Sequence, residues 1–305
     1  MIVRSRPHGL MLFFTLTGSI VPRILAPMAV TIGLSGAVTW AHGVLFSQKI
    51  TLTPIPFSLI GLALAIFLGF RNSASYDRFW EGRKLWGHLV IDCRTLARQM
   101  LYYLPDLDAA RQQRLIYRVI AFPYALKHHL RDSDPTPQIA EMLDEAERAS
   151  VAAAHNRPDA LVRRMSAELA AELAKGRANP MLVAEMESHV AAIAGIQAGC
   201  ERIKNTPLPF SYSLLLHRTA YLYCFALPFG LVDTIGFMTP FVVAIVSYTF
   251  FGLDALGDEI EEPFGIAPND LPLASLCRTI ERDLRAALGE DILPPPLGVV
   301  GHCLR

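Results

Sequence analysis

Apolar residues recur at every fourth position in one stretch of the chain, from Ile55 to Trp86. Leu62, Ile66 and Phe70 therefore share one stripe of a helix. The residues beside this stripe are small: Gly61, Ala63, Ala65 and Gly69. Small residues let helices approach closely within a membrane. The pattern indicates that the stripe faces a narrow pore and the small positions face neighbouring helices. A lipid-facing helix with chance spacing is the alternative that the pattern alone leaves open.

Four stretches have the length and the low charge of membrane-spanning helices. They are Ile24 to Phe46, Ile55 to Phe70, Leu214 to Leu231, and Ile235 to Leu253. At about 1.5 Å per residue, some 20 apolar residues cross a hydrocarbon core of roughly 30 Å. Gly230, Asp233 and Gly236 indicate a tight connection between the last two.

Between Arg71 and about Asn205 the chain becomes polar and amphipathic. Apolar residues from Phe79 to Leu104 fall three, four or seven positions apart, which predicts one long helix. Further helices are expected at 111–131, 138–154, 159–175, 180–204 and 274–288. No alternating strand pattern of useful length occurs, so the predicted class is an all-α membrane protein. We expect four parts: 1–70 with an N-terminal interfacial helix and two spans, a cytosolic helical domain at 71–210, two spans at 211–253, and a cytosolic C-terminal segment at 254–305.

The first residues, MIVRSRPHGLMLFFTLTGSIVPR, have basic residues ahead of a short apolar run. The run lacks a small-residue cleavage site and leads directly into a longer span. We therefore expect an interfacial leader helix that remains on the protein.

The composition supports a membrane protein. Hydrophobic residues make up 52% of the 305 residues and charged residues only 18%, whereas soluble domains have about 25% charged residues. Mean hydropathy is +0.33. The formal net charge of +0 gives no field that would attract nucleic acid, so we expect no such partner.

Cysteine and histidine positions argue against a disulfide scaffold, a zinc knuckle and an enzyme. The five cysteines are odd in number and include no CxxC pair. His128 and His129 are adjacent and point about 100° apart on a helix, unlike the i, i+4 pairs of metal sites. No GxSxG motif, phosphate-binding glycine loop or paired catalytic carboxylates occur.

Basic residues predict the topology. The two short loops, 47–54 and 233–236, contain one basic residue, Lys49, whereas the leader and the middle region are rich in Arg. The positive-inside rule then places both termini and the middle region in the cytoplasm.

Several motifs resemble those of the prokaryotic bestrophins. They are GFRNSASYDRFWEGRKLWG after the second span, NTPLPFSYSLLLHRTAYLY before the third, and TPFVVAIVSYTFFGLDALGDEIEEPFG continuing to NDLPL. HNRPDALVRR and LKHHLR in the middle region are similar to that family too. The resemblance covers essentially the whole chain and implies a homopentameric ion channel of a bacterial inner membrane, with one pore on the fivefold axis.

The resemblance also implies pore residues. In the family the second span lines an apolar neck, and the matching positions are Leu62, Ile66 and Phe70. A second constriction, near the cytosolic exit, is formed by one apolar side chain per subunit. Counting back from the Gly199-Cys-Glu-Arg202 motif places it at Met181.

An acidic run follows the fourth span and includes Asp258, Glu259, Glu261 and Glu262. It matches the region where animal bestrophins hold Ca²⁺, with fewer adjacent aspartates, and is the candidate cation-binding group. Ca²⁺ needs six to eight oxygens from several directions, whereas successive carboxylates on one helix point to different sides. The pattern therefore favours a structural role and requires no cofactor, and it disfavours a bound Ca²⁺ or Zn²⁺.

The resemblance to prokaryotic members implies permeation by monovalent cations, whereas the animal members pass anions. An anion (chloride) channel of the same fold is therefore one alternative. Another is a membrane-anchored scaffold or signalling protein, whose partner would dock on an aromatic and basic cluster: Tyr76, Arg78, Phe79, Trp80, Arg83, Lys84 and Trp86. A secondary transporter is a third alternative, although the sequence shows no repeated half.

Overall fold

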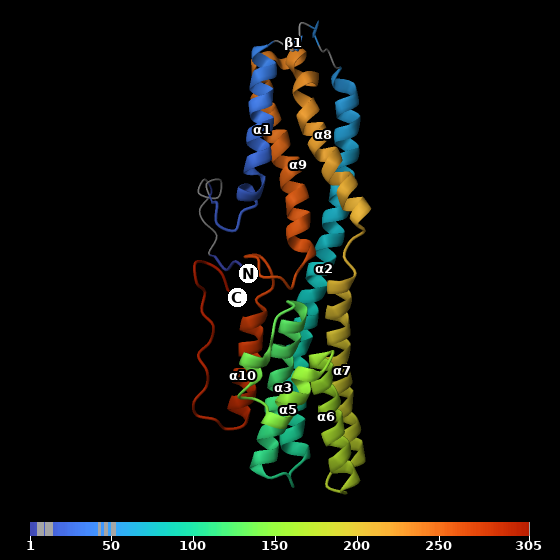
Figure 1. Ribbon diagram of the computed structural model, residues 1–305, viewed down its shortest axis with the longest axis vertical. Coiled ribbons are helices and arrows are strands. Elements are labelled where there is room, and N and C mark those ends of the chain that lie inside the picture. The colour runs from blue at the N-terminus through green and yellow to red at the C-terminus, as the bar shows by residue number, and fades with distance from the viewer. Residues whose placement is uncertain (5–8, 10–14, 42–43, 46–47, 50–52, 305) are drawn as a thin grey trace. The chain divides into compact units, whose positions relative to one another are not determined.

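The computed structural model describes residues 1–305 except 5–8, 10–14, 42–43, 46–47, 50–52 and 305 (Figure 1). The described chain is α-helical apart from a small hairpin of β1 (Val44–Leu45) and β2 (Gln48–Lys49). It divides into two compact units, and α2 (Pro54–Tyr103) contributes residues to both. The predicted all-α class is confirmed. The apolar run of the predicted leader helix, residues 10–14, lies outside the described residues, and the described residues 1–4 and 15–20 are not α-helical.

The first unit, called here the apolar unit, comprises residues 5–79 and 207–262. Its helices are α1 (Val21–Trp40), the first part of α2, α8 (Phe210–Ile235) and α9 (Thr239–Glu261), with a 3₁₀ turn, η2 (Gly236–Met238). Within the described part of the chain, three stretches are long and apolar enough to cross a membrane, and the third, Phe210–Glu261, contains both α8 and α9. The unit therefore has the four membrane-spanning helices that the sequence predicts.

The connection between α8 and α9 is shorter than expected. Gly236 ends α8 with φ +56°, a left-handed conformation that glycine adopts without steric cost. The hydroxyl of Thr239 donates a 2.6 Å hydrogen bond to the Gly236 carbonyl at the start of α9. Gly230 and Asp233, predicted to lie in the connection, are inside α8. At Gly230 the missing side chain makes room for the ring of Phe57 from α2.

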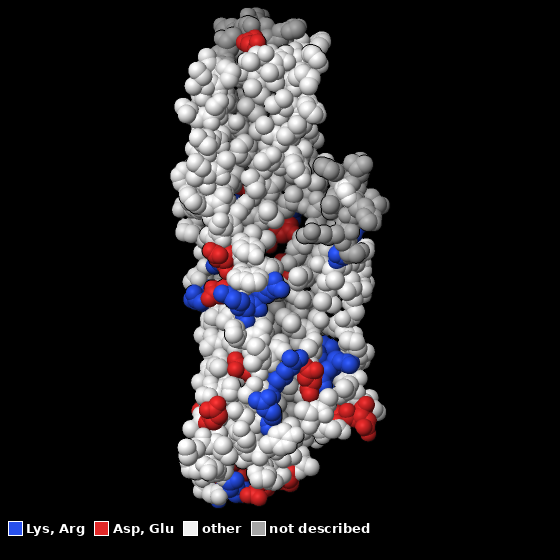
Figure 2. Space-filling view, turned by 180° about the vertical axis from the view of Figure 1, so that it is seen from behind, with Lys and Arg blue, Asp and Glu red and all other residues white. Residues whose placement is uncertain are grey.

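The core of the apolar unit lies where α1, α8 and α9 pack together with α2 (Figure 1). Its fully buried members are Ile24, Leu64, Leu68, Leu216, Ala220, Cys224, Phe250 and Phe251. The face seen in Figure 2 carries almost no charged side chains over this unit. A helix bundle with an apolar core and an apolar surface is suited to a lipid environment.

The second unit, called here the helical unit, comprises residues 1–4, 80–206 and 263–305. Besides the rest of α2, its helices are α3 (Ala109–Leu130), α4 (Thr136–Ile139), α5 (Glu145–Ala153), α6 (Arg157–Ala174), α7 (Pro180–Asn205) and α10 (Leu273–Ala287). Helix α3 packs against α6, α7 and α10. The apolar face predicted for the second half of α2 packs into the core of the helical unit. Its residues Trp86, Leu89, Cys93 and Leu96 are completely buried.

Side-chain caps determine where several of these helices begin. Asp108, Asp144, Asn156 and Asn179 each accept a hydrogen bond from a backbone N–H in the first turn of the following helix. The cap at Asp144 explains one difference from the sequence prediction. The single helix expected at 138–154 is two helices, because Asp144 starts α5 afresh.

Candidate pore face of helix α2

The predicted stripe of α2 lies on an exposed face of the apolar unit. Leu62 is 62% exposed, Ile66 48% and Phe70 63%, whereas Leu64 is 3% exposed and Leu68 is fully buried. One subunit thus packs one side of this helix and leaves three large apolar side chains on the other side uncovered. Such a face needs lipid, another subunit or a pore beside it.

Exposure alone does not separate these alternatives, because α2 also exposes Leu59, Ile60 and Phe67. At about 100° per residue, these positions and the stripe together form a broad exposed arc. Leu62 and Phe70 lie about 40° on either side of Ile66 around the helix axis, whereas the buried Leu64 and Leu68 lie about 160° from Ile66. The stripe is therefore the part of α2 directed most squarely away from the core of its own subunit.

The small residues beside the stripe differ in what they contact. A Cβ atom added at Gly61 would lie 2.7 Å from the hydroxyl oxygen of Tyr223 on α8. Gly61 therefore allows α2 and α8 to approach closely, as the sequence predicts for a small position. At Gly69, by contrast, no atom of the described residues lies within 4 Å of an added Cβ.

A buried ion-pair network begins one residue after the stripe. Arg71 is 1% exposed, and its Nη1 atom donates a 2.8 Å hydrogen bond to Oδ1 of Asp254 on α9. The other terminal nitrogen pairs with Asp258 and lies 3.9 Å from Oε2 of Glu261. Nδ1 of His217 on α8 lies 2.7 Å from the second oxygen of Asp254. The network thus joins α2, α8 and α9 below the apolar stripe.

This network also explains where the apolar unit ends. The sequence suggests a division after residue 70, where charged residues begin, whereas the apolar unit includes α2 as far as Phe79. Arg71 remains within it because its partners, Asp254 and Asp258, belong to α9. A buried arginine is stable only when its charge is paired and hydrogen-bonded.

The acidic run after the fourth span has internal partners. Asp258 and Glu261 belong to the Arg71 network, and the Glu261 carboxylate also accepts a 3.0 Å hydrogen bond from the backbone N–H of Leu208. Oε2 of Glu259 lies 3.2 Å from Nη1 of Arg23 on α1.

Glu262, the last predicted member of the run, is exposed. Among the residues that the structure describes, no three His, Cys, Asp or Glu side chains are grouped closely enough to hold a metal ion. Asp258, Glu259 and Glu261 each lie within ion-pair distance of an arginine.

The predicted exit residue is in the helical unit, at the start of α7. Met181 is 81% exposed, and its backbone N–H donates a 2.9 Å hydrogen bond to the side chain of Asn179, the N-cap. A large apolar side chain so exposed at a helix start is not core filler of this subunit. The role of Met181 therefore depends on what lies beside its side chain when subunits associate.

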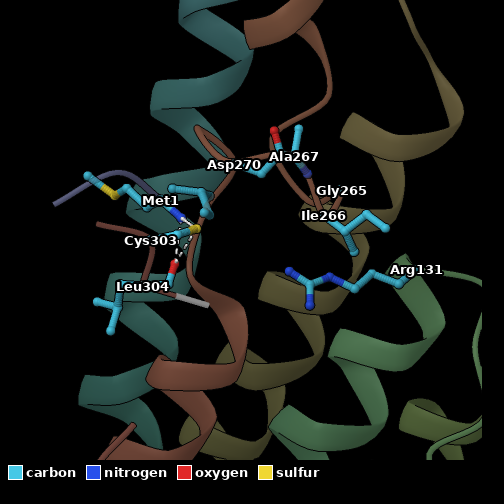
Figure 3. Close-up of a pocket in the computed structure, with 9 residues that line it drawn as sticks. Met1, Arg131, Gly265, Ile266, Ala267, Asp270, Cys303 and Leu304 are labelled. Carbon is cyan, nitrogen blue, oxygen red and sulfur yellow. Dashed lines mark hydrogen bonds between the residues drawn. The ribbon is translucent and has the colours of Figure 1, made fainter. Parts of the chain in front are cut away.

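The helical unit also contains a pocket of about 310 Å³, shown in Figure 3. It is lined by the turn from Gly265 to Asp270, by Arg131 and by residues of both terminal segments. Nε of Arg131 donates a 3.0 Å hydrogen bond to the carbonyl oxygen of Phe264. The carboxylate of Asp270 accepts a 2.7 Å bond from the backbone N–H of Ala267. Burial lowers the pKa of the Arg131 guanidinium. These contacts brace the turn after α9.

The aromatic and basic cluster considered for docking is not one surface. Trp86 is fully buried in the core of the helical unit. The guanidinium of Arg83 lies 4.9 Å from the centre of the Trp80 ring, and Nε of Arg78 donates to the Glu261 carbonyl oxygen at 3.1 Å. Several members of the cluster are thus engaged within their own subunit.

Sequence reasoning missed the Arg71 network. The sequence prediction placed Arg71 at the start of the cytosolic part and gave Arg71, Asp254 and His217 no partners. The one available signal was that Arg71 and Asp254 each directly follow a long apolar run. A charge at that position needs a partner.

The chain is similar in sequence to known proteins over most of its length. A family model described as "Bacterial/Fungal Bestrophin protein" matches residues 1–286. A relative from Mesorhizobium japonicum, named voltage-dependent anion channel-forming protein mll4386, is 45% identical over 97% of this chain and 94% of its own. The voltage-dependent anion channel-forming protein YneE of Salmonella typhi is 39% identical over 96% of each chain.

A solved structure has the same fold. The crystal structure of a bacterial bestrophin homologue from Klebsiella pneumoniae is 39% identical, with a TM-score of 0.85, and the match covers 88% of this chain and 100% of that one. The family match spans most of the chain, and the fold, the four spans and the resemblance noted in the sequence agree with it. The chain belongs to the bacterial and fungal bestrophin family.

Proposed function

We propose that this protein is one subunit of a homopentameric ion channel of a bacterial inner membrane, with its pore neck lined by Leu62, Ile66 and Phe70. The observation that carries the proposal is the two-sided character of α2. Leu64 and Leu68 are buried on one side, and the three stripe residues stand exposed on the other. Membership of a channel-forming family supports placing a pore beside that exposed side.

The chemistry of the stripe suits a gate. An ion in a narrow apolar ring loses hydration water and receives no polar group in exchange, which is costly. Apolar constrictions can also close by dewetting. Five copies of Leu62, Ile66 and Phe70 would give three stacked rings, the bulkiest at Phe70. The ring faces and edges of Phe70 carry a quadrupole that interacts with ions.

The ion that we propose is a monovalent anion such as chloride. The relatives from Mesorhizobium japonicum and Salmonella typhi carry the names of voltage-dependent anion channel-forming proteins. These names support an anion channel better than they support the cation channel that the sequence resemblance implies. The apolar neck itself carries no charge that would select a sign.

Met181 is our proposed lining residue of a second constriction, near the cytosolic exit. Its exposure at the start of α7 supports this role. A ring of glutamates there would repel anions at one end of the pore. Met181→Glu should therefore change the rectification of the current, and an unchanged current–voltage curve would contradict the assignment.

The topology we propose has both termini and the middle region in the cytoplasm. The near absence of Lys and Arg from the short loops of the apolar unit supports it, since Lys49 is the only basic residue between residues 41 and 54. The lipid bilayer, further copies of the chain and permeating ions are the partners of the protein.

Purified protein reconstituted into liposomes tests the proposal. We expect a pentamer by mass measurement in detergent, an ion flux that protein-free liposomes lack, and a reversal potential in a KCl gradient close to the chloride equilibrium potential. A pentamer with a reversal potential near that of potassium would retain the channel and overturn the anion assignment. A monomer without flux would favour the membrane-anchored scaffold.

A further inference from the structure

Asp77 lies on the same face of α2 as the proposed neck residues. Helix α2 continues without interruption from Pro54 to Tyr103, so the register of the stripe carries on past Phe70. At about 100° per residue, Asp77 is about 20° from Ile66 and about 20° from Phe70 around the helix axis. It is about 10 Å beyond Phe70 along the axis, at about 1.5 Å per residue.

The burial pattern supports this placement. Ser73 and Asp77 are exposed, as are Leu62, Ile66 and Phe70, whereas Arg71 and Ser75 are buried on the opposite side. The exposed and buried positions keep the same register across the junction from apolar to polar sequence. The uncovered face of α2 therefore changes from apolar to polar after Phe70 and bears a carboxylate at Asp77.

Among the residues that the structure describes, Asp77 has no counter-ion, unlike the acidic residues of α9. Asp254, Asp258 and Glu261 all lie within ion-pair distance of Arg71. Asp77 makes no hydrogen bond or salt bridge with any residue that the structure describes. Its carboxylate is thus an uncompensated negative charge on the face that we assign to the pore.

We propose that Asp77 forms a ring of carboxylates just beyond the neck and sets how strongly the channel discriminates between anions and cations. This inference rests on the proposed pore. Five negative charges around a pathway raise the local concentration of cations and lower that of anions. The ring opposes anion passage and keeps the channel from being fully anion-selective. Salt screens the effect, because the Debye length is about 10 Å at 0.1 M and about 3 Å at 1 M.

The test is the reversal potential of Asp77→Asn in planar bilayers under a KCl gradient. We expect it to move toward the chloride equilibrium potential, with the potassium-to-chloride permeability ratio falling roughly twofold or more at low salt and less at about 1 M. Asp77→Glu keeps the charge and should behave as the parent protein. The matched control is Glu145→Gln, which removes an exposed carboxylate from α5 and should change nothing.

A second variant restores the charge on the assembled channel. Asp77→Cys should show the same shift as Asp77→Asn. A negatively charged methanethiosulfonate reagent should then return the reversal potential toward the parent value, while the same reagent leaves the parent protein unchanged. This arm does not depend on how Asp77→Asn folds.

The outcomes distinguish this inference from the proposed pore. If Asp77→Asn and unmodified Asp77→Cys match the parent while alanine at Ile66 changes the conductance, the pore stands and the role of Asp77 is overturned. If substitutions at neither Asp77 nor Ile66 affect the current, the proposed pore and the role of Asp77 are both overturned. An equal shift in Glu145→Gln would also overturn the specific role of Asp77.

Discussion

Nη1 of Arg71 on α2 donates a 2.8 Å hydrogen bond to Oδ1 of Asp254 on α9, and both residues are almost completely buried. The pair joins two spanning helices directly below the apolar stripe. Through Arg71, Asp258 and Glu261 at the C-terminal end of α9 are also linked to the helix that we assign to the pore. Removing one partner of the pair should cost much folding stability, because it leaves the other charge buried without a counter-ion.

Arg71→Met should destabilise the protein strongly, by about 3–5 kcal/mol, since it leaves Asp254 buried without its arginine. The measurement is thermal unfolding of the purified protein in detergent. Arg94→Met is the control, because Arg94 and Asp283 form an exposed pair worth about 0–1 kcal/mol. The double change Arg71→Met with Asp254→Leu should recover much of the loss. Equal melting temperatures for Arg71→Met and Arg94→Met would contradict this account.

The contact between Gly230 and Phe57 predicts a steric effect. A Cβ at position 230 would lie 2.5 Å from the Phe57 ring, so Gly230→Ala should destabilise the apolar unit by about 1–3 kcal/mol through overpacking. Adding Phe57→Leu should relieve part of the loss.

The control for Gly230 is Gly195→Ala in α7, where no atom lies within 4 Å of the new Cβ. That substitution should stabilise its helix by up to about 1 kcal/mol. The melting temperatures of the Gly230→Ala and Gly195→Ala variants measure both effects. A neutral or stabilising Gly230→Ala would show that α2 and α8 are less closely packed than described.

Periodicity predicted the exposed stripe and the buried face of α2 correctly, because both follow from helical spacing within one segment. Leu62, Ile66 and Phe70 are exposed together, and Trp86, Leu89, Cys93 and Leu96 are buried together. The bounds of α6 and α7 also agree with the sequence within two residues, since Asn156 and Asn179 cap them locally.

Long-range pairings could not be predicted in this way. Arg71 and Asp254 are 183 residues apart, and no local pattern relates them. The same holds for Gly230, which resembles a turn residue in the sequence but serves helix packing because Phe57 lies against it. An exposed apolar face can lie against lipid or line a pore, depending on how the subunits are arranged. The pattern of apolar residues within one subunit is the same in both cases.

Glu172 in the helical unit predicts a pH effect. Its side chain is buried beside Arg177, with contacts of 2.7 and 2.6 Å from Nε and Nη2, and hydrogen bonds from Arg177 lower the pKa of the carboxyl. A lowered pKa stabilises the folded state above the ordinary value of 4.5, and the contribution is lost as the pH falls through the folded-state pKa.

Glu172→Gln should therefore melt at a lower temperature than the parent at pH 7, and the difference should shrink as the pH falls below about 4.5. Melting temperatures of both proteins between pH 7 and the acid limit of solubility measure this. Glu145→Gln, at an exposed position, should show no such trend. A difference that stays constant with pH would mean that the carboxylate charge of Glu172 is not what stabilises this site.

In the proposed channel, the face of α2 that bears Ile66 lines the pore, and Ile66 can be compared with its neighbour in the sequence, Phe67. Ile66 and Phe67 are similarly exposed, at 48% and 49%, but point about 100° apart on the helix. The measurement is single-channel conductance in planar bilayers for Ile66→Ala and Phe67→Ala. We expect a higher conductance or open probability for Ile66→Ala, a further increase when Leu62 and Phe70 are also alanine, and parent-like currents for Phe67→Ala. Parent-like currents for the triple alanine variant, or an equal change for Phe67→Ala, would contradict the assignment of this face to the pore.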